Sequence, residues 1–320
     1  MAESRSIHQQ DEAFFQRVFL RLQNFFYQQG WQDSPITPKE ELLRIELLQQ
    51  FWMPLAYQIA EWRQQKTLIL GILGGQGTGK TTLAAILTEI LAEMELQVCR
   101  LSIDDLYKTY ADRLQLQQFD PRYRWRGPPG THDVSLGLSV LKQLRQVSPQ
   151  HPVAVPRFDK SLHQGAGDRI LPERLTAADV VLFEGWFVGV RPIDPAWFDH
   201  APSLIISESD RTFARDVNDR LQDYLPLWDE LDRLIVLNPV DYRLTLQWRK
   251  EAEQMMKATG KPGMSDAEIE EFVQYFWRSL HPELFIPPLL AQPEWVDWII
   301  ELDENRLPTS IYCPYNPGSD

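Results

Sequence analysis

The sequence is poor in cysteine: 320 residues contain only Cys99 and Cys313. This excludes a framework of several disulfides and fits a reducing compartment, for which we expect the cytoplasm. Clusters of Cys and His at metal-ligand spacing are missing, so no structural zinc site is predicted. No apolar run approaches the ~20 residues that span a bilayer, and we expect no membrane association. The polar, acid-containing segment 1–12 resembles neither a secretory signal nor a transit peptide.

Positive charge is also scarce, since 32 Lys and Arg face 45 Asp and Glu for a net charge of −13. Such a surface repels nucleic acid, and we expect no nucleic-acid partner. Segment 120–174 is an exception, with nine Lys and Arg against five acids. This basic segment indicates either a site for a small anion or a solvated loop surface.

Segment 1–65 has a helical pattern. Apolar residues at helical spacing predict a first helix over 11–29. A second begins at Thr37-Pro38-Lys39-Glu40, a capping box with proline at the first helical position, and Pro54 is expected to kink it. We interpret this segment as a helical extension packed on the core; an interaction surface is the alternative.

From residue 66, short apolar runs alternate with helical stretches. Runs without polar alternation suit strands buried on both faces, which predicts an α/β fold whose mostly parallel sheet is covered by helices on both faces. The core is predicted over 66–307, followed by an irregular tail over 308–320 that contains three prolines. The runs are Thr67–Leu73, Val98–Ile103, Val153–Val155, Val180–Phe183, Leu204–Ile206, Leu234–Leu237 and Trp298–Leu302.

Residues 74–81 match G-x-x-x-x-G-K-[ST] in full, between an apolar strand and a helix. This is the pattern of a P-loop NTPase, whose backbone N–H groups and helix N-terminus surround phosphates. Lys80 would reach the β- and γ-phosphates of ATP, and Thr81 would offer its hydroxyl to Mg²⁺. The alternative is a glycine turn that binds nothing. The predicted nucleotide-binding residues are Gly74, Gly75, Gln76, Gly77, Thr78, Gly79, Lys80, Thr81 and Thr82.

Two carboxylates end apolar runs, where a parallel sheet forms its crevice. Glu184 is the predicted second metal residue, with a solvated strand-end glutamate as the alternative. Asp104 would face the γ-phosphate and accept the proton of an attacking hydroxyl. Within the pair Asp104-Asp105 one residue can instead cap a helical turn, and we predict Asp104 as the base. Segment 238–241 lacks the lysine of a guanine-reading N-K-x-D motif, which favours a small-molecule kinase over a GTPase.

An anionic acceptor requires cations near the γ-phosphate. Arg157 and Lys160 follow a short apolar run and are predicted to bind the anionic acceptor. His132 is predicted either to donate to the substrate or to be a satisfied loop histidine. Arg249, on a long polar helix before Gly260, is the predicted lid arginine that stabilises the transferring phosphoryl group; a solvent-facing arginine is the alternative.

Seven short motifs follow one another along the core: Gly79–Thr82, Ser102–Tyr107, Gly130–Asp133, Pro156–Ser161, Gly167–Arg169, Phe183–Trp186 and Gly260–Asp266. This ordered set resembles the plant-type D-glycerate 3-kinases, over roughly residues 66 to 307. A phosphate loop alone is common to many families, whereas the ordered set is specific. More distantly similar are uridine kinase, phosphoribulokinase and pantothenate kinase, in which the aspartate matching Asp104 is the presumed base.

The resemblance implies transfer of phosphate from Mg²⁺-ATP to D-glycerate, which gives 3-phosphoglycerate, the last step of photorespiratory carbon recovery. The alternatives are another small-molecule kinase of the same group, or a silent P-loop protein that acts as a regulatory partner. The retained Lys80, Thr81, Asp104 and Glu184 argue against silence. Plant members carry a chloroplast transit peptide; none is expected here, which fits either a prokaryotic cytoplasmic protein or a processed form.

Overall fold

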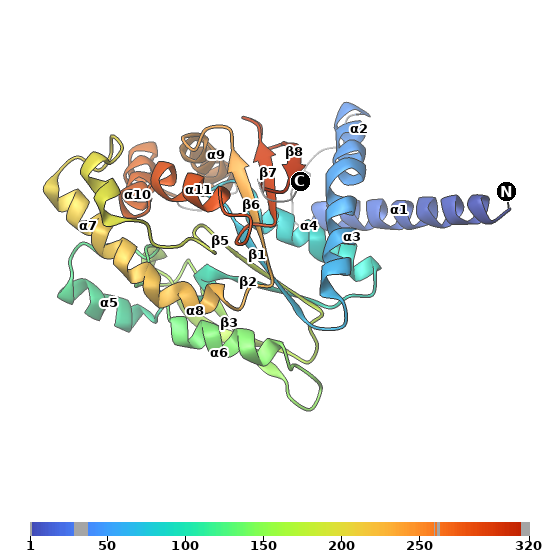
Figure 1. Ribbon diagram of the computed structural model, residues 1–320, viewed down its shortest axis with the longest axis horizontal. Coiled ribbons are helices and arrows are strands. Elements are labelled where there is room, and N and C mark those ends of the chain that lie inside the picture. The colour runs from blue at the N-terminus through green and yellow to red at the C-terminus, as the bar shows by residue number, and fades with distance from the viewer. Residues whose placement is uncertain (1, 29–37, 259, 261–262, 315–320) are drawn as a thin grey trace.

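A computed structural model describes residues 2–28, 38–258, 260 and 263–314 (Figure 1). Its centre is a six-stranded sheet in the order β2-β5-β1-β6-β7-β8, in which every pairing except β7–β8 is parallel. The predicted α/β fold with a mostly parallel sheet is therefore confirmed. The strands of this sheet are β1 (Leu68–Leu73), β2 (Val98–Ser102), β5 (Val180–Gly185), β6 (Arg233–Pro239), β7 (Trp298–Leu302) and β8 (Pro308–Tyr312).

Helices cover both faces of the sheet because its central strands are apolar on both sides. In β1, Ile69 and Leu73 pack into one core cluster, whereas Leu68, Leu70 and Ile72 pack into the other. The second cluster is completed by α1, α3 and α4, and the first by α6, α7, α8, α10 and α11. The helices are α1 (Ala2–Gln28), α2 (Pro38–Leu47), α3 (Met53–Arg63), α4 (Lys80–Glu93), α5 (Tyr110–Phe119), α6 (Val134–Leu144), α7 (Glu208–Arg220), α8 (Leu225–Trp228), α9 (Leu244–Ala258), α10 (Asp266–Ser279) and α11 (Pro282–Leu290).

The N-terminal helices pack on the core as expected. Val18 and Leu22 of α1 are buried against α4, and Arg21 pairs with Glu89 at 2.6 Å and with Glu93 at 3.1 Å. The expected second helix contains a π-helical turn, η1 (Leu48–Trp52), between α2 and α3. Because Pro54 has no N–H to donate, the regular hydrogen-bond ladder is interrupted at this point. The predicted cap at Thr37 lies outside the described residues.

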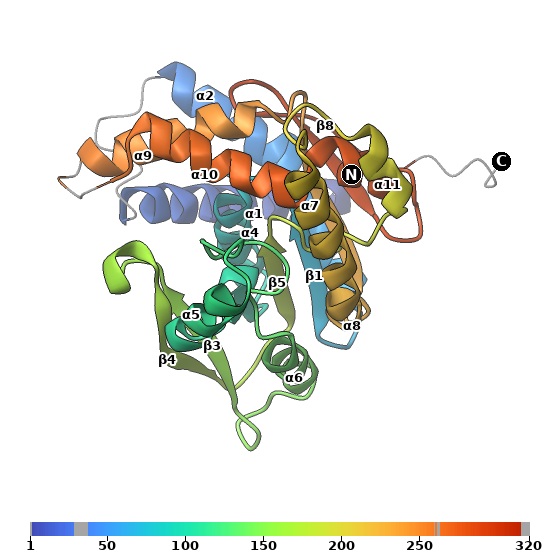
Figure 2. The same cartoon turned by 90° about the vertical axis from the view of Figure 1, so that its left-hand side faces the viewer.

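One predicted strand is present but lies in a different sheet, and another predicted strand is wrong. Segment 153–155 belongs to β3 (Val153–Asp159), which pairs antiparallel with β4 (Asp168–Leu175) in a separate two-stranded ribbon (Figure 2). The sequence analysis missed β4 because its side chains are mostly exposed and charged. Segment 204–206 is a loop in which Ile205 is buried and Ile206 is 70% exposed, so one apolar side chain anchors it without strand pairing.

The prediction of an irregular tail is also wrong for residues 308–312. They form β8, which pairs antiparallel with β7 at the edge of the sheet. A proline as the first residue of an edge strand needs no hydrogen-bond donor, so Pro308 does not prevent pairing. The remaining tail residues 315–320 lie outside the described part.

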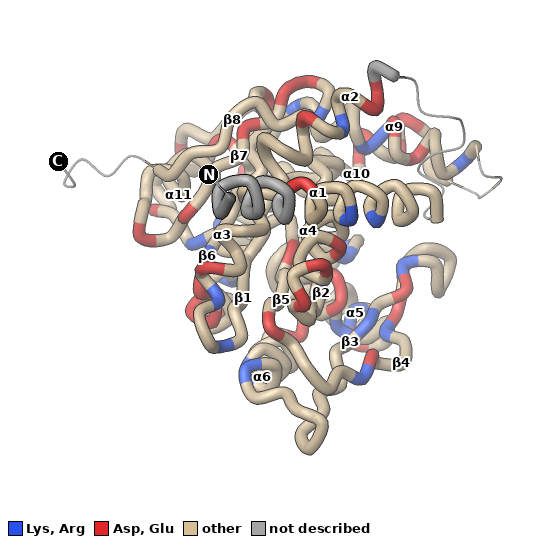
Figure 3. Tube along the Cα trace, turned by 90° about the vertical axis from the view of Figure 1, so that its right-hand side faces the viewer, with Lys and Arg blue, Asp and Glu red and all other residues tan. Residues whose placement is uncertain are grey.

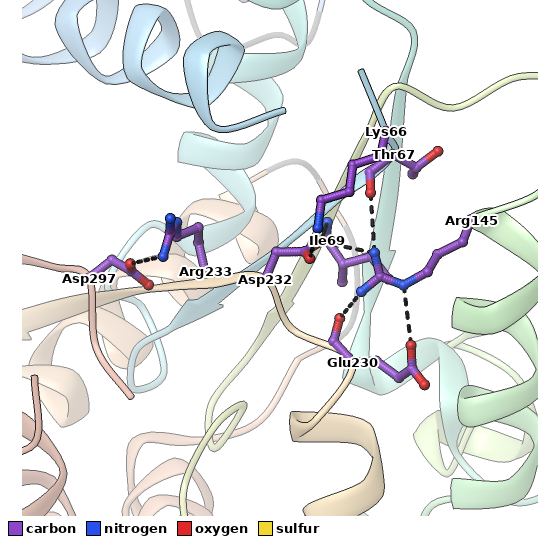
Figure 4. A network of polar contacts seen from close by, with 8 residues as sticks. All are labelled: Lys66, Thr67, Ile69, Arg145, Glu230, Asp232, Arg233 and Asp297. Carbon is purple, nitrogen blue, oxygen red and sulfur yellow. Dashed lines mark hydrogen bonds and ion pairs between the residues drawn. The ribbon is translucent and has the colours of Figure 1, made fainter. Parts of the chain in front are cut away.

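An ionic network fixes the sheet at the end opposite to the phosphate loop (Figure 4). Arg145, which follows α6, donates to Glu230 and Asp232 and to the carbonyl oxygen of Thr67. Asp232 in turn accepts from the backbone N–H of Ile69 in β1 at 2.8 Å. Burial opposes ionisation of Asp232, but the Ile69 N–H, Lys66 and Arg145 lower its pKa. The network thereby ties α6 to the starts of β1 and β6.

Candidate active site

The carboxyl ends of three parallel strands meet at one edge of the sheet. In the ladder, Leu73 of β1 lies beside Gly185 of β5, and Ser102 of β2 lies beside Glu184. The phosphate loop follows Leu73, and Asp104 follows Ser102. Parallel pairing therefore brings the loop, Glu184 and Asp104 together at this edge.

The phosphate loop has the backbone geometry that its glycines permit. Gly77 and Gly79 have φ of +75° and +87°, and Gly79 is the N-cap of α4. A Cβ on Gly77 would lie 2.7 Å from the Cβ of Trp248, so the loop also needs glycine to approach α9. The Lys80 ammonium donates to the carbonyl oxygen of Gly75 at 2.7 Å, which folds this side chain back over the loop.

A cleft of about 400 Å³ opens at the loop, between the ends of β2 and β5 and the helices α9 and α10. Residues predicted to bind phosphate and residues predicted to bind the acceptor both line it, so the geometry allows phosphoryl transfer within one cleft. The lining side chains that could bind or react with a ligand are Lys80, Thr81, Asp104, Tyr107, Arg126, Lys160, Glu184, Trp186 and Arg249.

Thr81 and Glu184 fit a magnesium site. The Thr81 hydroxyl donates to Glu184 Oε1 at 3.1 Å, and both side chains line the cleft. Mg²⁺ takes oxygen ligands and keeps several waters and phosphate oxygens, so a hydroxyl and one carboxylate suffice from the protein. In keeping with this, the described residues contain no group of three or more His, Cys, Asp or Glu that could hold a metal alone.

Asp104 is paired with Lys160 across the cleft. Lys160 Nζ lies 2.6 Å from Asp104 Oδ2, and the Tyr107 hydroxyl also donates to this carboxylate. Burial favours protonation of Asp104, but the two partners outweigh it and hold the pKa of Asp104 well below its usual range. The same ion pair raises the pKa of Lys160. Asp104 is therefore ionised at neutral pH, as a proton acceptor must be.

Asp105 has a structural role instead. It accepts from the backbone N–H of Ser102 at 3.0 Å in a capping box, and from the N–H of Phe158 at 3.2 Å. It also pairs with Arg157 at 3.0 Å. These contacts use the acceptor capacity of Asp105 for the turn and for β3, which leaves Asp104 as the carboxylate in the cleft.

Arg157 does not line the cleft, contrary to its predicted role. Its guanidinium pairs with Asp105 and with Glu173 at 2.6 Å, and donates to the carbonyl oxygen of Arg100. Because Arg157 belongs to β3, which pairs with β4, its side chain holds the ribbon against β2. Side chains alternate between the two faces of a strand, and within β3 this directs Arg157 away from the cleft. Lys160 lies beyond the end of β3 and enters the cleft.

Arg126 takes the place that was predicted for Arg157. It lines the cleft beside Asp104 and Lys160, and its guanidinium donates to the carbonyl oxygen of Gly165. From the sequence, Arg126 was part of the basic segment but had no predicted role. Its position at the start of the rigid segment 126–133 could have indicated that it lies in the site. Figure 3 shows Lys and Arg positions around α5, β3 and β4, with acidic positions among them.

His132 lies behind the cleft. It is 2% exposed, its Nδ1 is 2.8 Å from the Tyr224 hydroxyl, and its ring stacks on Tyr107. Burial lowers the pKa of His132 to about 3, so the ring is neutral. This geometry favours a role in orienting Tyr107, and through it Asp104, over direct contact with a substrate.

Arg249 projects from α9 into the cleft, where a lid arginine is expected. It pairs with Glu253 at 2.6 Å. Glu253 is 3% exposed and also accepts from the backbone N–H of Met264 at 2.7 Å. The position of Arg249 is thus coupled to the segment that connects α9 with α10.

Comparisons with known proteins agree with this geometry, although no family model matches the sequence. An uncharacterised kinase of Schizosaccharomyces pombe is 32% identical over 262 residues, 77% of this chain and 92% of that protein. The chloroplastic D-glycerate 3-kinase of Arabidopsis thaliana is 31% identical over 254 residues, 75% of this chain. The chain belongs to this family of P-loop kinases. It spans about half of the Arabidopsis relative, because the match covers 54% of that protein.

A solved structure leads to the same family. The D-glycerate 3-kinase of Cryptococcus neoformans var. grubii aligns with a TM-score of 0.74 at 27% identity, over 83% of this chain and 99% of that one. This kinase family member is therefore an ATP-dependent phosphotransferase. Among its described helices, none combines the length and apolar character that crossing a bilayer requires.

Proposed function

We propose that this kinase transfers the γ-phosphoryl group of ATP to the 3-hydroxyl of D-glycerate, which yields 3-phosphoglycerate and ADP. The observation that carries the proposal is the shared cleft, in which the phosphate loop faces a carboxylate and two cations. The relatives named D-glycerate 3-kinase support the choice of acceptor. The resemblance also supports a place in photorespiratory carbon recovery, and the two free thiols fit a cytoplasmic setting.

Three groups stabilise the phosphoryl group as charge develops on it. The backbone of the phosphate loop and Lys80 surround the β- and γ-phosphates, and Arg249 approaches from the lid side. Burial lowers the pKa of Lys80, partly offset by Glu184 and Asp104. Thr81 and Glu184 would hold Mg²⁺, which when bound supplies charge neutralisation between the β- and γ-phosphates.

Asp104 receives the proton of the acceptor. As the 3-oxygen of glycerate forms its bond to the γ-phosphorus, the bond from that phosphorus to the β–γ bridging oxygen breaks, and ADP leaves. The hydroxyl proton passes to the Asp104 carboxylate. Tyr107, stacked on the neutral His132, keeps that carboxylate in position.

Arg126 and Lys160 recognise the glycerate carboxylate. The planar guanidinium of Arg126 can donate two parallel hydrogen bonds to a carboxylate, and Lys160 adds a point charge beside the base. Both side chains lie on the acceptor side of the cleft with Asp104 and Tyr107. A neutral nucleoside acceptor has no group that would match these two cations.

An acceptor panel tests the proposal. ADP release is measured with ATP, Mg²⁺ and, in turn, D-glycerate, L-glycerate, uridine, pantothenate and ribulose 5-phosphate. We expect D-glycerate to be the preferred acceptor and to exceed uridine, which has no carboxylate, by at least about a hundredfold in kcat/KM, because a site built on charged hydrogen bonds rejects an acceptor that leaves its cations unpaired. Preference for another acceptor would refute the assignment.

A further inference from the structure

A second cavity, of about 280 Å³, lies where the N-terminal helices meet the kinase core. The core contributes Thr82 and Ile86 from α4 and Leu307 from the β7–β8 turn. The opposite wall consists of Phe26 of α1 and Trp52 of η1, with further apolar side chains around them. This nucleoside-sized space therefore forms only when segment 1–65 is in place.

The chain leads from the phosphate loop directly to this cavity, because Thr82, the residue after the motif, lines it. In a P-loop protein with bound nucleotide, the motif lysine (here Lys80) contacts the β- and γ-phosphates and the hydroxyl of the next residue (here Thr81) binds the metal. The backbone N–H groups that follow contact the phosphates nearer the sugar. Thr82 is the next residue, and its side chain lines the cavity. A nucleotide held by the loop with its γ-phosphate in the cleft thus extends its ribose and base past Thr82.

The turn beside the cavity is built to keep its shape. Asp303 Oδ1 accepts from the N–H groups of Asn305 and Leu307, both at 2.8 Å. Arg306, at φ +67°, occupies the left-handed region, a strained conformation for a residue with a side chain. Its guanidinium pairs with Glu251 of α9 and lies 5.8 Å from the ring of Trp248. The turn and the lid helix therefore hold one wall of the cavity together.

The opposite wall is fixed in the same way. Arg21 pairs with Glu89 and Glu93 of α4, while Val18 and Leu22 are buried on the same side of α1. These contacts keep the C-terminal part of α1, with Phe26, near the N-terminal part of α4, as the adjacent helices in Figure 1 show. Aromatic rings fixed by such packing suit a flat apolar ligand.

A different cavity, of about 270 Å³, touches the phosphate loop itself, at Gly75 and Gln76. It is lined by Gly75, Gln76, Trp186 and Ile286 among others. Gln76 and Trp186 also line the catalytic cleft, so this cavity adjoins the γ-phosphate end of the loop. It is the competing location for the base, and the course of the chain from the loop to Thr82 argues against it.

We propose that the N-terminal helical extension forms one wall of the nucleoside pocket, and that the purine of ATP lies between Phe26 and Trp52 on one side and Thr82 and Leu307 on the other. This inference rests on the proposed function as an ATP-dependent kinase, because it assumes that the loop binds the phosphates of a nucleotide. It assigns a ligand-binding role to a segment outside the P-loop core.

Calorimetric titration of the full chain with Mg²⁺-ADP and with Mg²⁺-tripolyphosphate tests the proposal, since tripolyphosphate occupies only the phosphate loop. Gln23 lines the cavity from α1, so Gln23→Trp fills it, whereas Asn24→Trp places the same ring at an exposed neighbouring position. We expect Gln23→Trp to weaken ADP binding by about tenfold, the value of an aromatic contact, and to leave tripolyphosphate binding unchanged. Asn24→Trp should change neither affinity, and thermal melting confirms that both variants are folded.

Three results would overturn the inference: unchanged ADP affinity in Gln23→Trp, equal weakening of both ligands, or selective loss of ADP binding in Ile286→Trp, which fills the competing cavity. Lys80→Ala separates this failure from failure of the proposed function. If the phosphate loop binds nucleotide, Lys80→Ala weakens ADP and tripolyphosphate together; if both still bind as in the wild type, the kinase assignment itself is refuted.

Discussion

Lys160 Nζ lies 2.6 Å from Asp104 Oδ2, so the carboxylate that we propose as the base is joined to a cation from beyond the end of β3. The two residues follow strands of separate sheets, β2 of the six-stranded sheet and β3 of the β3–β4 ribbon. The ion pair keeps Asp104 ionised and, in the proposed mechanism, holds an acceptor-binding cation next to the attacking oxygen. This double role makes the pH dependence of turnover informative.

Replacing Lys160 with alanine should move the acid limb of the kcat/KM profile to higher pH. A base acts only when deprotonated, so activity is lost as the pH falls through the pKa of Asp104. In the wild type that pKa is held low by Lys160 against the opposing effect of burial. Without the ammonium, burial prevails and the pKa of Asp104 rises.

Lys160→Arg is the matched control, because it retains the charge. Its acid limb should stay near that of the wild type, even if its KM for glycerate changes. An acid limb in Lys160→Ala that coincides with the wild-type limb would show that the ion pair does not set the pKa of the base.

The adjacent aspartates should separate into catalytic and structural residues. Asp104→Asn keeps shape but cannot accept a proton, so we expect kcat to fall by about 10²–10⁴-fold with little change in the KM for ATP. Asp105→Asn should instead lower the melting temperature, because it weakens the cap at Ser102 and the pair with Arg157. Steady-state kinetics and thermal melting of both variants measure this, and the reverse pattern would exchange the two assignments.

Arg126 and Arg157 should differ in the same manner. Arg126→Ala removes a charged partner of the acceptor, and should raise the KM for glycerate by about ten- to a hundredfold while that for ATP stays close to normal. Arg157→Ala should lower the free energy of unfolding by about 1–3 kcal/mol, because Asp105 loses its charged partner. A specific rise in the glycerate KM of Arg157→Ala would restore the role that the sequence suggested.

Arg145 gives a test of stability far from the chemistry. Arg145→Ala removes its hydrogen bonds to Glu230 and Asp232, and should lower the free energy of unfolding by about 1–3 kcal/mol with kcat unchanged. The folded-state pKa of Asp232 is depressed, so its stabilisation is complete above the unfolded-state pKa and is lost as the pH falls through the folded one. Denaturant titrations should therefore show the difference between variant and wild type shrinking in acid.

Sequence reasoning was most successful where one pattern has one structural outcome. The apolar runs around Leu68–Leu73 and Val180–Phe183 indicated strands buried on both faces, and parallel pairing then placed Glu184 and Asp104 near the phosphate loop. The fold class followed from these elements and is confirmed.

Sequence reasoning failed where the direction or the exposure of a side chain determined its role. Arg157 and Lys160 are three residues apart in one motif, but only Lys160 enters the cleft, because Arg157 sits within a strand that alternates its side chains. β4 and β8 were missed since an exposed ribbon strand and an edge strand need no continuous apolar run. Arg126 carried no periodic signal, and only the folded arrangement shows that it lines the same cleft as Asp104 and Lys160.

The most direct test of the central claim is the identity of the product, followed by ³¹P NMR with ATP, Mg²⁺ and D-glycerate. The wild type should convert the γ-phosphate resonance of ATP into that of 3-phosphoglycerate, one equivalent for each ADP. Lys80→Ala, folded but without the ammonium over the phosphate loop, should form it at least about a hundredfold more slowly. Formation of 2-phosphoglycerate, of inorganic phosphate alone, or of 3-phosphoglycerate at an undiminished rate in Lys80→Ala would contradict the account.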